Sequence, residues 1–276
     1  MSLNSVNTNR GALVALQNLN QTNAELSTTQ NRINTGKKVA NTKDNGAIWA
    51  IAQGQKAETS ALGVVKDSLA RGQSVVDVAL AGGEAISDLL VEMKTKARAA
   101  TDSTLSADSR SALNADFKAL RDQITAVVDN ASFDGANMLK ASGNAVAALA
   151  NAKGTKSVNV KAQSMAFGGT NIAFAATTSL NSAASAKTVA TAIDTAITKV
   201  SSALAELGTG SKALSIQSNF TSKLQDTLEA GVGNLVDADL AKESAKLQAL
   251  QTKQQLGIQA LSIANSSAGS LLSLFR

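Results

Sequence analysis

The feature that most constrains this chain is an unbroken heptad pattern through residues 58–100. Apolar or small residues recur there at alternating steps of three and four, which is the spacing of a coiled-coil seam. A helix of this length extends about 60 Å at ~1.5 Å per residue, so the pattern predicts an elongated helical rod. The larger seam residues, which we expect in the rod core, are Leu62, Val65, Leu69, Val76, Ile86, Leu90 and Met93.

Two other segments have the same spacing and are expected to pack with the first. Residues 107–131 follow a capping residue, either Ser106 or Asp108, and residues 187–230 extend to a break predicted at Gly231–Gly233. Together the three segments predict a coiled-coil-like bundle. The rod-core residues expected from the second and third segments are Leu113, Phe117, Leu120, Ile124, Ile193, Ile197, Val200 and Leu204.

Composition agrees with long, closely packed helices. The 276 residues include no Pro, where average usage of about 5% would give roughly 14, and each Pro in a helix interior costs about 3 kcal/mol. Ala accounts for 51 residues, against six Phe, one Trp and no Tyr, so the helices pack largely through small side chains. Gly72 and Gly83 lie on the long seam, where they weaken helix propensity but allow close backbone approach.

One stretch, residues 141–186, departs from the helical period. Ser157–Ala162 alternates apolar and polar residues, and Asn171–Phe174 follows the Gly168–Gly169 dipeptide, so we expect these two segments to form a β-hairpin. Its content of Gly, Ser and Thr predicts a surface position. The dipeptide Asp134–Gly135 marks a turn just before this stretch.

Both ends of the chain have the pattern of amphipathic helices with too little apolar surface to be stable alone. Gly36 is expected to cap the first, and no carboxylate side chain follows Glu243 in the last. An exposed apolar tail favours aggregation unless assembly buries it, so we expect the two helices to pair and then to pack against neighbouring subunits. The expected polymer-packing residues are Val6, Leu13, Leu16, Leu19, Leu26, Ile33, Leu240, Leu247, Leu250, Leu261, Leu271, Leu274 and Phe275.

The predicted fold class is therefore mostly α: an elongated coiled-coil-like rod with a small β-hairpin, and terminal helices that pair as a separate polymerisation domain. A head-to-tail interface whose rotation does not close produces a filament, so this design predicts a polymerising subunit. The expected divisions are an N-terminal core helix at 1–42, rod helices at 43–140, the hairpin and outer loops at 141–186, a rod helix at 187–233 and a C-terminal core helix at 234–276.

Missing residue types exclude most catalytic and metal chemistry. Without Cys or His the chain has no thiolate nucleophile, no Ser–His pair and no imidazole or thiolate metal ligand, so we expect neither an enzyme nor a cofactor. The acids Asp237, Asp239 and Glu243 lie near a helix start and are expected to cap it rather than to bind a metal. The net charge of +5 is scattered and no apolar run reaches about 18 residues, so neither nucleic acid nor membrane is an expected partner.

Short characteristic motifs lie at both ends of the chain. At the N-terminus these are SVNTN at 5–9, QNRINTGKKVANTKD at 30–44 and AIA at 50–52. At the C-terminus they are VDADLAKE at 236–243, LQ at 250–251, QQLG at 254–257, AN at 264–265 and LLSLFR at 271–276. These motifs resemble those of bacterial flagellins, and the chain most closely resembles the short flagellins of Caulobacter-type alphaproteobacteria. Asn45–Gly46 and Trp49 differ from the residues commoner in the family at these positions. The absence of Pro from the C-terminus is a further difference.

The resemblance implies a structural subunit that is secreted and polymerises into the hollow extracellular flagellar filament used for swimming. The terminal helices would line its core, the rod would form its wall, and large outer domains would be absent. The partners implied are further copies of the chain, an export chaperone on the C-terminal helix, the filament cap and the hook-associated proteins, with export through the flagellar secretion apparatus. Two alternatives stay open: a hook–filament junction protein of the same system, and a secreted enzyme or effector, which would need a catalytic cluster that the sequence does not display.

The resemblance also concerns the vertebrate innate flagellin receptor. Receptor-active members carry LQRVRELA in their first long rod helix, where Leu90–Ala97 of this chain is LVEMKTKA. Glu92 reverses a charge, and Lys94 lacks the planar guanidinium fork of Arg. We therefore expect poor activation of the receptor. The receptor-equivalent positions are Val91, Glu92, Lys94, Thr95 and Lys96.

Overall fold

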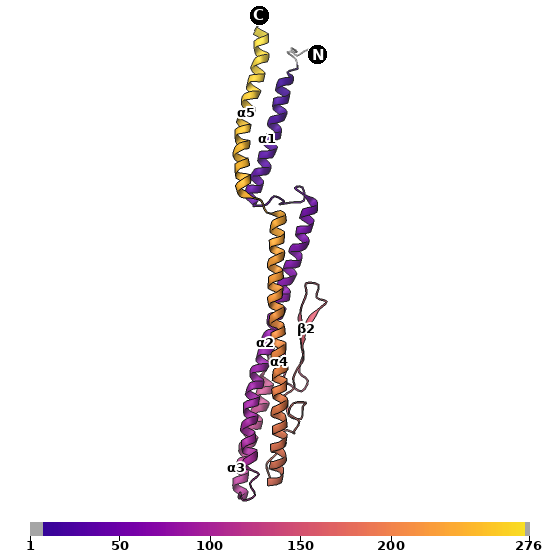
Figure 1. Cartoon of the computed structure of the whole chain (residues 1–276), viewed down its shortest axis with the longest axis vertical. Helices are drawn as coiled ribbons and strands as arrows, with labels where there is room; N and C mark the ends of the chain where they lie inside the picture. The colour runs from indigo at the N-terminus through magenta and orange to yellow at the C-terminus, as the bar shows by residue number, and fades with distance from the viewer. Residues whose placement is uncertain (1–7, 274–276) are drawn as a thin grey trace. The chain divides into compact units, whose positions relative to one another are not determined.

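The computed structural model describes residues 8–273, with side chains described from residue 8 to residue 266. The predicted class is confirmed, because long helices and one small antiparallel sheet make up the described chain (Figure 1). The elements in chain order are α1 (Arg10–Thr35), α2 (Gly46–Ala99), α3 (Ala107–Asn130), β1 (Val146–Leu149), β2 (Ser157–Val160), α4 (Ala183–Val236) and α5 (Leu240–Ser273).

The chain divides into two compact units, which differ from the sequence-based division. The second unit spans Glu58–Asp226, and the first joins the residues up to Ala57 with those from Thr227 onwards. Residues 43–57 and 227–233, assigned to the rod from sequence, thus belong to the unit of the terminal helices. The physical reason is a small separate core in the first unit, built from Val39, Ala52, Val232 and Val236 with Trp49 packed against it.

Helix α4 continues through Gly231–Gly233, so the predicted break there is wrong. A Gly in a helix interior costs only about 1 kcal/mol relative to Ala, which packing can offset. Here Val232 and Val236 are 7% and 3% exposed within the core of the first unit. Their burial keeps the helix intact until Val236, after which Asp237 forms a backbone bridge with Lys37.

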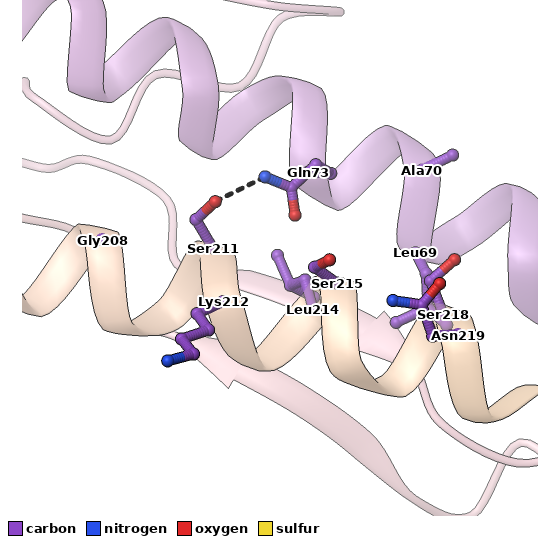
Figure 2. Close-up of a pocket in the computed structure, with 10 residues that line it drawn as sticks. All are labelled: Leu69, Ala70, Gln73, Gly208, Ser211, Lys212, Leu214, Ser215, Ser218 and Asn219. Carbon is purple, nitrogen blue, oxygen red and sulfur yellow. Dashed lines mark hydrogen bonds between the residues drawn. The ribbon is translucent and has the colours of Figure 1, made fainter.

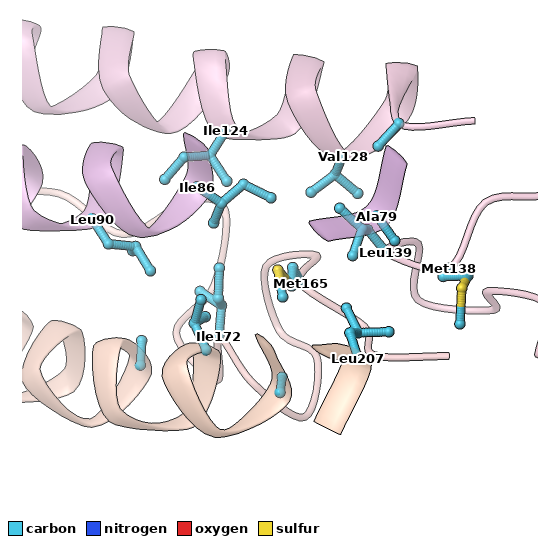
Figure 3. Close-up of a cluster of buried hydrophobic side chains, with 14 of the residues drawn as sticks. Ala79, Ile86, Leu90, Ile124, Val128, Met138, Leu139, Met165, Ile172 and Leu207 are labelled. Carbon is cyan, nitrogen blue, oxygen red and sulfur yellow. The ribbon is translucent and has the colours of Figure 1, made fainter. Parts of the chain in front are cut away.

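The core of the second unit is the heptad seam of α2 packed against α3, α4 and the loops between them (Figure 3). Twelve of the fifteen predicted rod-core residues are buried. The other three, Leu113, Ile197 and Leu204, are half-buried against the same cluster. The twelve are Leu62, Val65, Leu69, Val76, Ile86, Leu90, Met93, Phe117, Leu120, Ile124, Ile193 and Val200.

The hairpin has a different partner from the one predicted. β2 pairs antiparallel with β1, with Val146 opposite Val160, whereas Asn171–Phe174 is not a strand. A side-chain-stabilised turn closes this hairpin, because Asn151 Oδ1 accepts the backbone N–H groups of Thr155 and Lys156 at 3.0 and 3.1 Å. The carbonyl of Lys156 in turn accepts the N–H of Ala150 at 2.8 Å.

The predicted surface position of this region is also wrong, since it contributes a large share of the core. Val146, Ala148 and Val160 are buried, and Met165, Ile172 and Leu180 are fully buried. Glycines on the neighbouring helices make room for them. A Cβ at Gly72 would lie 3.0 Å from Val146 Cγ1, and one at Gly210 would lie 2.5 Å from Val160 Cγ1. The close approach predicted at Gly72 and Gly83 is thereby confirmed, since Met165 and Leu204 crowd the second of these.

Apart from the break at Gly231–Gly233, the predicted helix stops and turns named here are present. Gly36 ends α1 in the left-handed conformation at φ 67°, and Ser106 Oγ accepts the N–H of Ser109 at 3.1 Å to cap α3. Asp134 and Gly135 both have positive φ, at 49° and 77°, in the turn after α3. These local signals depend on few residues, which explains why sequence alone predicts them.

We predict that Gly210→Ala destabilises the second unit, because the new Cβ would overlap Val160 on β2. Overpacking costs about 1–3 kcal/mol, which outweighs the gain of up to about 1 kcal/mol in helix propensity. Gly208→Ala is the matched control, since its Cβ meets nothing within 4 Å in the same helix and should stabilise. Urea titration of helical circular dichroism measures both, and equal midpoints for the two variants would contradict the docking role of Gly210.

Candidate assembly site on the terminal helices

Helices α1 and α5 pack side by side as an antiparallel pair in the first unit (Figure 1). Contacts follow one register along the whole pair, because partners advance along α1 as they recede along α5. The contacts are Asn9 Nδ2 donating to the Ala264 carbonyl at 2.7 Å, Leu19 against Gly257, Gln254 Nε2 donating to Asn23 Oδ1 at 2.7 Å, and Arg32 Nη1 paired with Glu243 Oε1 at 3.0 Å.

The interface between these helices is less apolar than a coiled-coil seam. Leu19, Leu26, Ile33, Leu247 and Leu261 are half-buried, and only Leu250 is buried among the predicted packing residues whose side chains the structure describes. Between the α1 leucines lie Thr22 and Thr29, at 2% and 0% exposure. Sequence reasoning missed them because they are polar, although they stand three residues after Leu19 and Leu26 and so complete the heptad row.

Much of the apolar surface on both helices faces solvent in the single chain. Leu13, Leu16 and Leu240, predicted as packing residues, are 58%, 43% and 49% exposed. Val6, Leu274 and Phe275 lie outside the described residues, and Leu271 lies in α5 beyond the last described side chain. Further exposed apolar residues that the heptad rows did not include are Val14, Leu256, Ile258 and Ile263. Such a surface is typical of a protein–protein interface.

The acids at the start of α5 act as a cap and an ion-pair partner. Asp239 Oδ1 accepts the backbone N–H groups of Ala241 and Lys242, both at 3.1 Å, which caps the helix as expected. Glu243 instead pairs with Arg32 of α1. Among the described residues no three His, Cys, Asp or Glu side chains come together as metal ligands would. A separate result is that no helix in the described chain is long and apolar enough to span a membrane.

The second unit contains an open groove of about 670 Å³ between α2 and α4 (Figure 2). Leu69 and Leu214 line it, but Ser211 and Ser218 occupy the next seam positions, and these small side chains leave space. Gln73 Nε2 donates to Ser211 Oγ at 2.5 Å across the groove. Amide, hydroxyl and apolar groups make up most of the lining, with Lys212 as its one charged side chain, so this groove has the character of a solvated surface.

The receptor-equivalent positions are only partly exposed. Val91, Glu92 and Thr95 are exposed, whereas Lys94 and Lys96 are half-buried and paired with carboxylates of neighbouring helices. Lys94 contacts Asp194 of α4, and its hydrogen bond lowers the pKa of that carboxyl. Lys96 donates to Asp116 of α3 at 2.7 Å, and this hydrogen bond raises the pKa of the lysine. Both lysines therefore also make contacts between helices of the bundle, which sequence did not predict.

Two family models match most of the chain: the bacterial flagellin N-terminal helical region at residues 6–144 and the bacterial flagellin C-terminal helical region at residues 190–275. The flagellin FljM of Caulobacter vibrioides is 56% identical over 276 residues, with 100% of both chains covered. A flagellin of Brucella melitensis is 37% identical over 285 residues, with 99% of both covered. A crystal structure of Bacillus cereus flagellin aligns with 56% of this chain and 88% of that chain at 24% identity and a TM-score of 0.49.

Similarity to flagellins thus extends through both helical regions and over the full length of the chain. Members of this family form the extracellular flagellar filament and are structural subunits rather than enzymes. The chain therefore belongs to the bacterial flagellin family and is a filament subunit.

Proposed function

We propose a division of labour in which the α1–α5 pair drives polymerisation and the Glu58–Asp226 unit folds independently of it. The observation that carries this proposal is the contrast in burial between the two. The seam of α2 is buried almost throughout the second unit, whereas Leu13, Leu240, Leu256 and Ile263 of the terminal helices are about half exposed or more. Burying such residues against neighbouring subunits supplies favourable free energy, at ~25 cal/mol per Å² of apolar surface.

In the filament, the terminal helices of many subunits line the core, and the second unit forms the wall. The exposed apolar residues of the second unit support lateral contacts there, since five large ones remain in solvent in the single chain. They are Val64, Val91, Phe133, Ile216 and Phe220. The similarity of the whole chain to flagellins favours this assembly, and nothing favours the hook–filament junction protein.

Before assembly the subunit binds an export chaperone through α5 and passes through the flagellar secretion apparatus. At the growing end it meets the filament cap, and at the base the filament joins the hook-associated proteins. The exposed Leu256, Ile258 and Ile263 of α5 support the chaperone contact, because a carrier that covers them would prevent premature association.

Removing residues 240–276 is expected to leave a soluble, folded protein that forms no filaments. The truncation deletes the whole of α5 and leaves the core of the Glu58–Asp226 unit untouched. Seeded polymerisation observed by electron microscopy measures the loss, and circular dichroism should retain nearly the same helix content per residue. Normal filaments from the truncated protein would refute the division of labour.

The second expectation concerns order before assembly. Amide hydrogens of α1 and α5 should exchange quickly in the monomer and slowly in the filament, because much of the apolar surface of both helices is exposed in the single chain. Hydrogen–deuterium exchange with mass spectrometry compares the two states. Amides of α2 within residues 62–93 serve as the internal control and should be protected in both, and strong protection of α1 and α5 in dilute monomer would speak against the proposal.

We further propose that this flagellin activates the vertebrate innate flagellin receptor poorly. Relative to the receptor-active pattern, Glu92 reverses an exposed charge, Thr95 removes an acid, and Lys96 replaces an apolar residue. Losing such groups at the centre of an interface costs ~2 kcal/mol or more each. The ion pairs of Lys94 and Lys96 with Asp194 and Asp116 also support this, since they engage both lysines within the subunit.

Changing Glu92→Arg, Lys94→Arg, Thr95→Glu and Lys96→Leu together should raise receptor potency by about tenfold or more, which corresponds to about 1.4 kcal/mol. A reporter-cell assay with monomeric protein measures it, beside a receptor-active flagellin. Since Lys96→Leu removes the ion pair with Asp116, thermal unfolding of the variant is measured as the control. Unmodified protein with the potency of a receptor-active flagellin would overturn the idea.

A further inference from the structure

The heptad rows of α1 and α5 do not by themselves fix how the two helices align. Equivalent residues recur every seven positions, so a slip of one heptad presents a similar seam. The seam has little apolar shape complementarity that would favour one alignment over another. Its central positions hold the buried Thr22 and Thr29, and Gly257 faces Leu19. Backbone hydrogen bonds between residues 36–39 and 236–238 favour one alignment where the two helices are joined, and within the helices a side-chain interaction can strengthen that choice.

Arg32 and Glu243 form the one ion pair between α1 and α5 within the described residues, at 3.0 Å. Their side chains are 34% and 12% exposed, so the pair is partly removed from water. A slip of one heptad in one direction would place Leu250 opposite Arg32 and leave a half-buried arginine without a partner. The opposite slip would place Glu243 opposite Glu25, which brings two carboxylates together. Both alternatives are electrostatically unfavourable.

The Arg32–Glu243 ion pair also has unmet hydrogen bonds. It is therefore better suited to selecting one alignment of the helices than to stabilising the helix pair. Arg32 Nε and Glu243 Oε2 are buried and make no hydrogen bond with any described residue. Buried ion pairs with unmet hydrogen bonds contribute little net free energy, because desolvation offsets the attraction, but removing one partner is strongly destabilising. The hydrogen bond between the side chains of Asn23 and Gln254 is exposed, and water can replace it in any register.

We infer that the Arg32–Glu243 ion pair, beside the backbone bonds at the joined ends, sets the register along α1 and α5, and so decides which apolar residues the two helices present to neighbouring subunits. This inference rests on the proposed function, in which the paired helices build the filament core. Arg32 and Glu243 are positioning residues: they select one alignment among several that the seam would accept.

The test uses pairs of introduced cysteines as reporters of alignment. The chain has no Cys of its own, so every cross-link must come from the introduced pair. Asn23→Cys with Gln254→Cys is the native reporter, since these side chains are in contact in the register seen here. Asn23→Cys with Leu261→Cys or with Leu247→Cys reports the two slipped registers, one heptad to either side. Dibromobimane, which bridges only closely spaced thiols, is applied to filaments and to soluble protein, and the intramolecular product is separated by mass.

In the unaltered background only the native reporter should cross-link. Arg32→Met with Glu243→Leu should keep the helix content, since apolar residues of similar size replace the buried pair. The same double variant should reduce the native product at least about threefold and yield a product from a slipped reporter. Charge reversal, Arg32→Glu with Glu243→Arg, should restore the native product. The matched control, Arg10→Met with Lys246→Met, removes one exposed charge from each of the same two helices and should leave the register unchanged.

Exclusively native cross-links in the Arg32→Met/Glu243→Leu filaments would overturn the inference. Where that variant does not assemble, the charge-reversed protein decides: restored filaments with the native product support the inference, and failure of this rescue rejects it. A different result tests the proposed function itself. If the unaltered background gives no native product in filaments, the two helices are not paired there, whatever the role of the ion pair.

Discussion

Close packing along the α2 seam is the interaction on which the rest of the second unit depends. Its large residues, such as Ile86 and Met93, are completely buried, while glycines at the remaining seam positions admit neighbouring side chains to within van der Waals contact of the backbone. That combination lets a chain poor in aromatic residues bury a loop-rich segment and a hairpin against long helices. The unit thereby has a core of its own, which supports the proposal that it folds before the subunit meets a neighbour.

The terminal helices use the same heptad spacing with a different chemistry. Threonines replace apolar residues in the α1 row, and Gly257 replaces one in α5. Less apolar surface is buried within the pair, and more of it, including Ile258 and Ile263, is left outside. The heptad spacing determines that α2 and the terminal helices are all helical. The size and polarity of the seam side chains determine whether a helix buries its apolar surface within its own chain or only within an assembly.

Sequence reasoning succeeded where structure follows from local period and failed where it follows from distant contacts. The helices, their caps and the burial of Phe117 or Val200 come from spacing alone. The partner of β2 could not be predicted from spacing. Its sequence, Val-Ala-Ala-Leu at Val146–Leu149, alternates between apolar and polar residues too weakly to indicate a strand. Its docking requires Gly72 and Gly210 on two helices far away in the chain. Similarly, the helical state of Gly231–Gly233 depends on Val39 and Ala52, which no local window contains.

For the assembly site, the sequence predicted the helices and several packing residues but not what aligns them. Arg32 and Glu243 are separated by more than two hundred residues, and each alone looks like an ordinary surface charge.

The physical need for such a pair follows from the demands on a polymer subunit. Terminal helices that bury a large apolar area on their own would be stable alone and would have little left to offer a neighbour. Helices with a small polar seam keep their apolar surface for assembly, but they then lack the shape complementarity that normally sets register. A partly desolvated ion pair resolves this conflict, because it penalises misalignment strongly while adding little to the stability of the isolated pair.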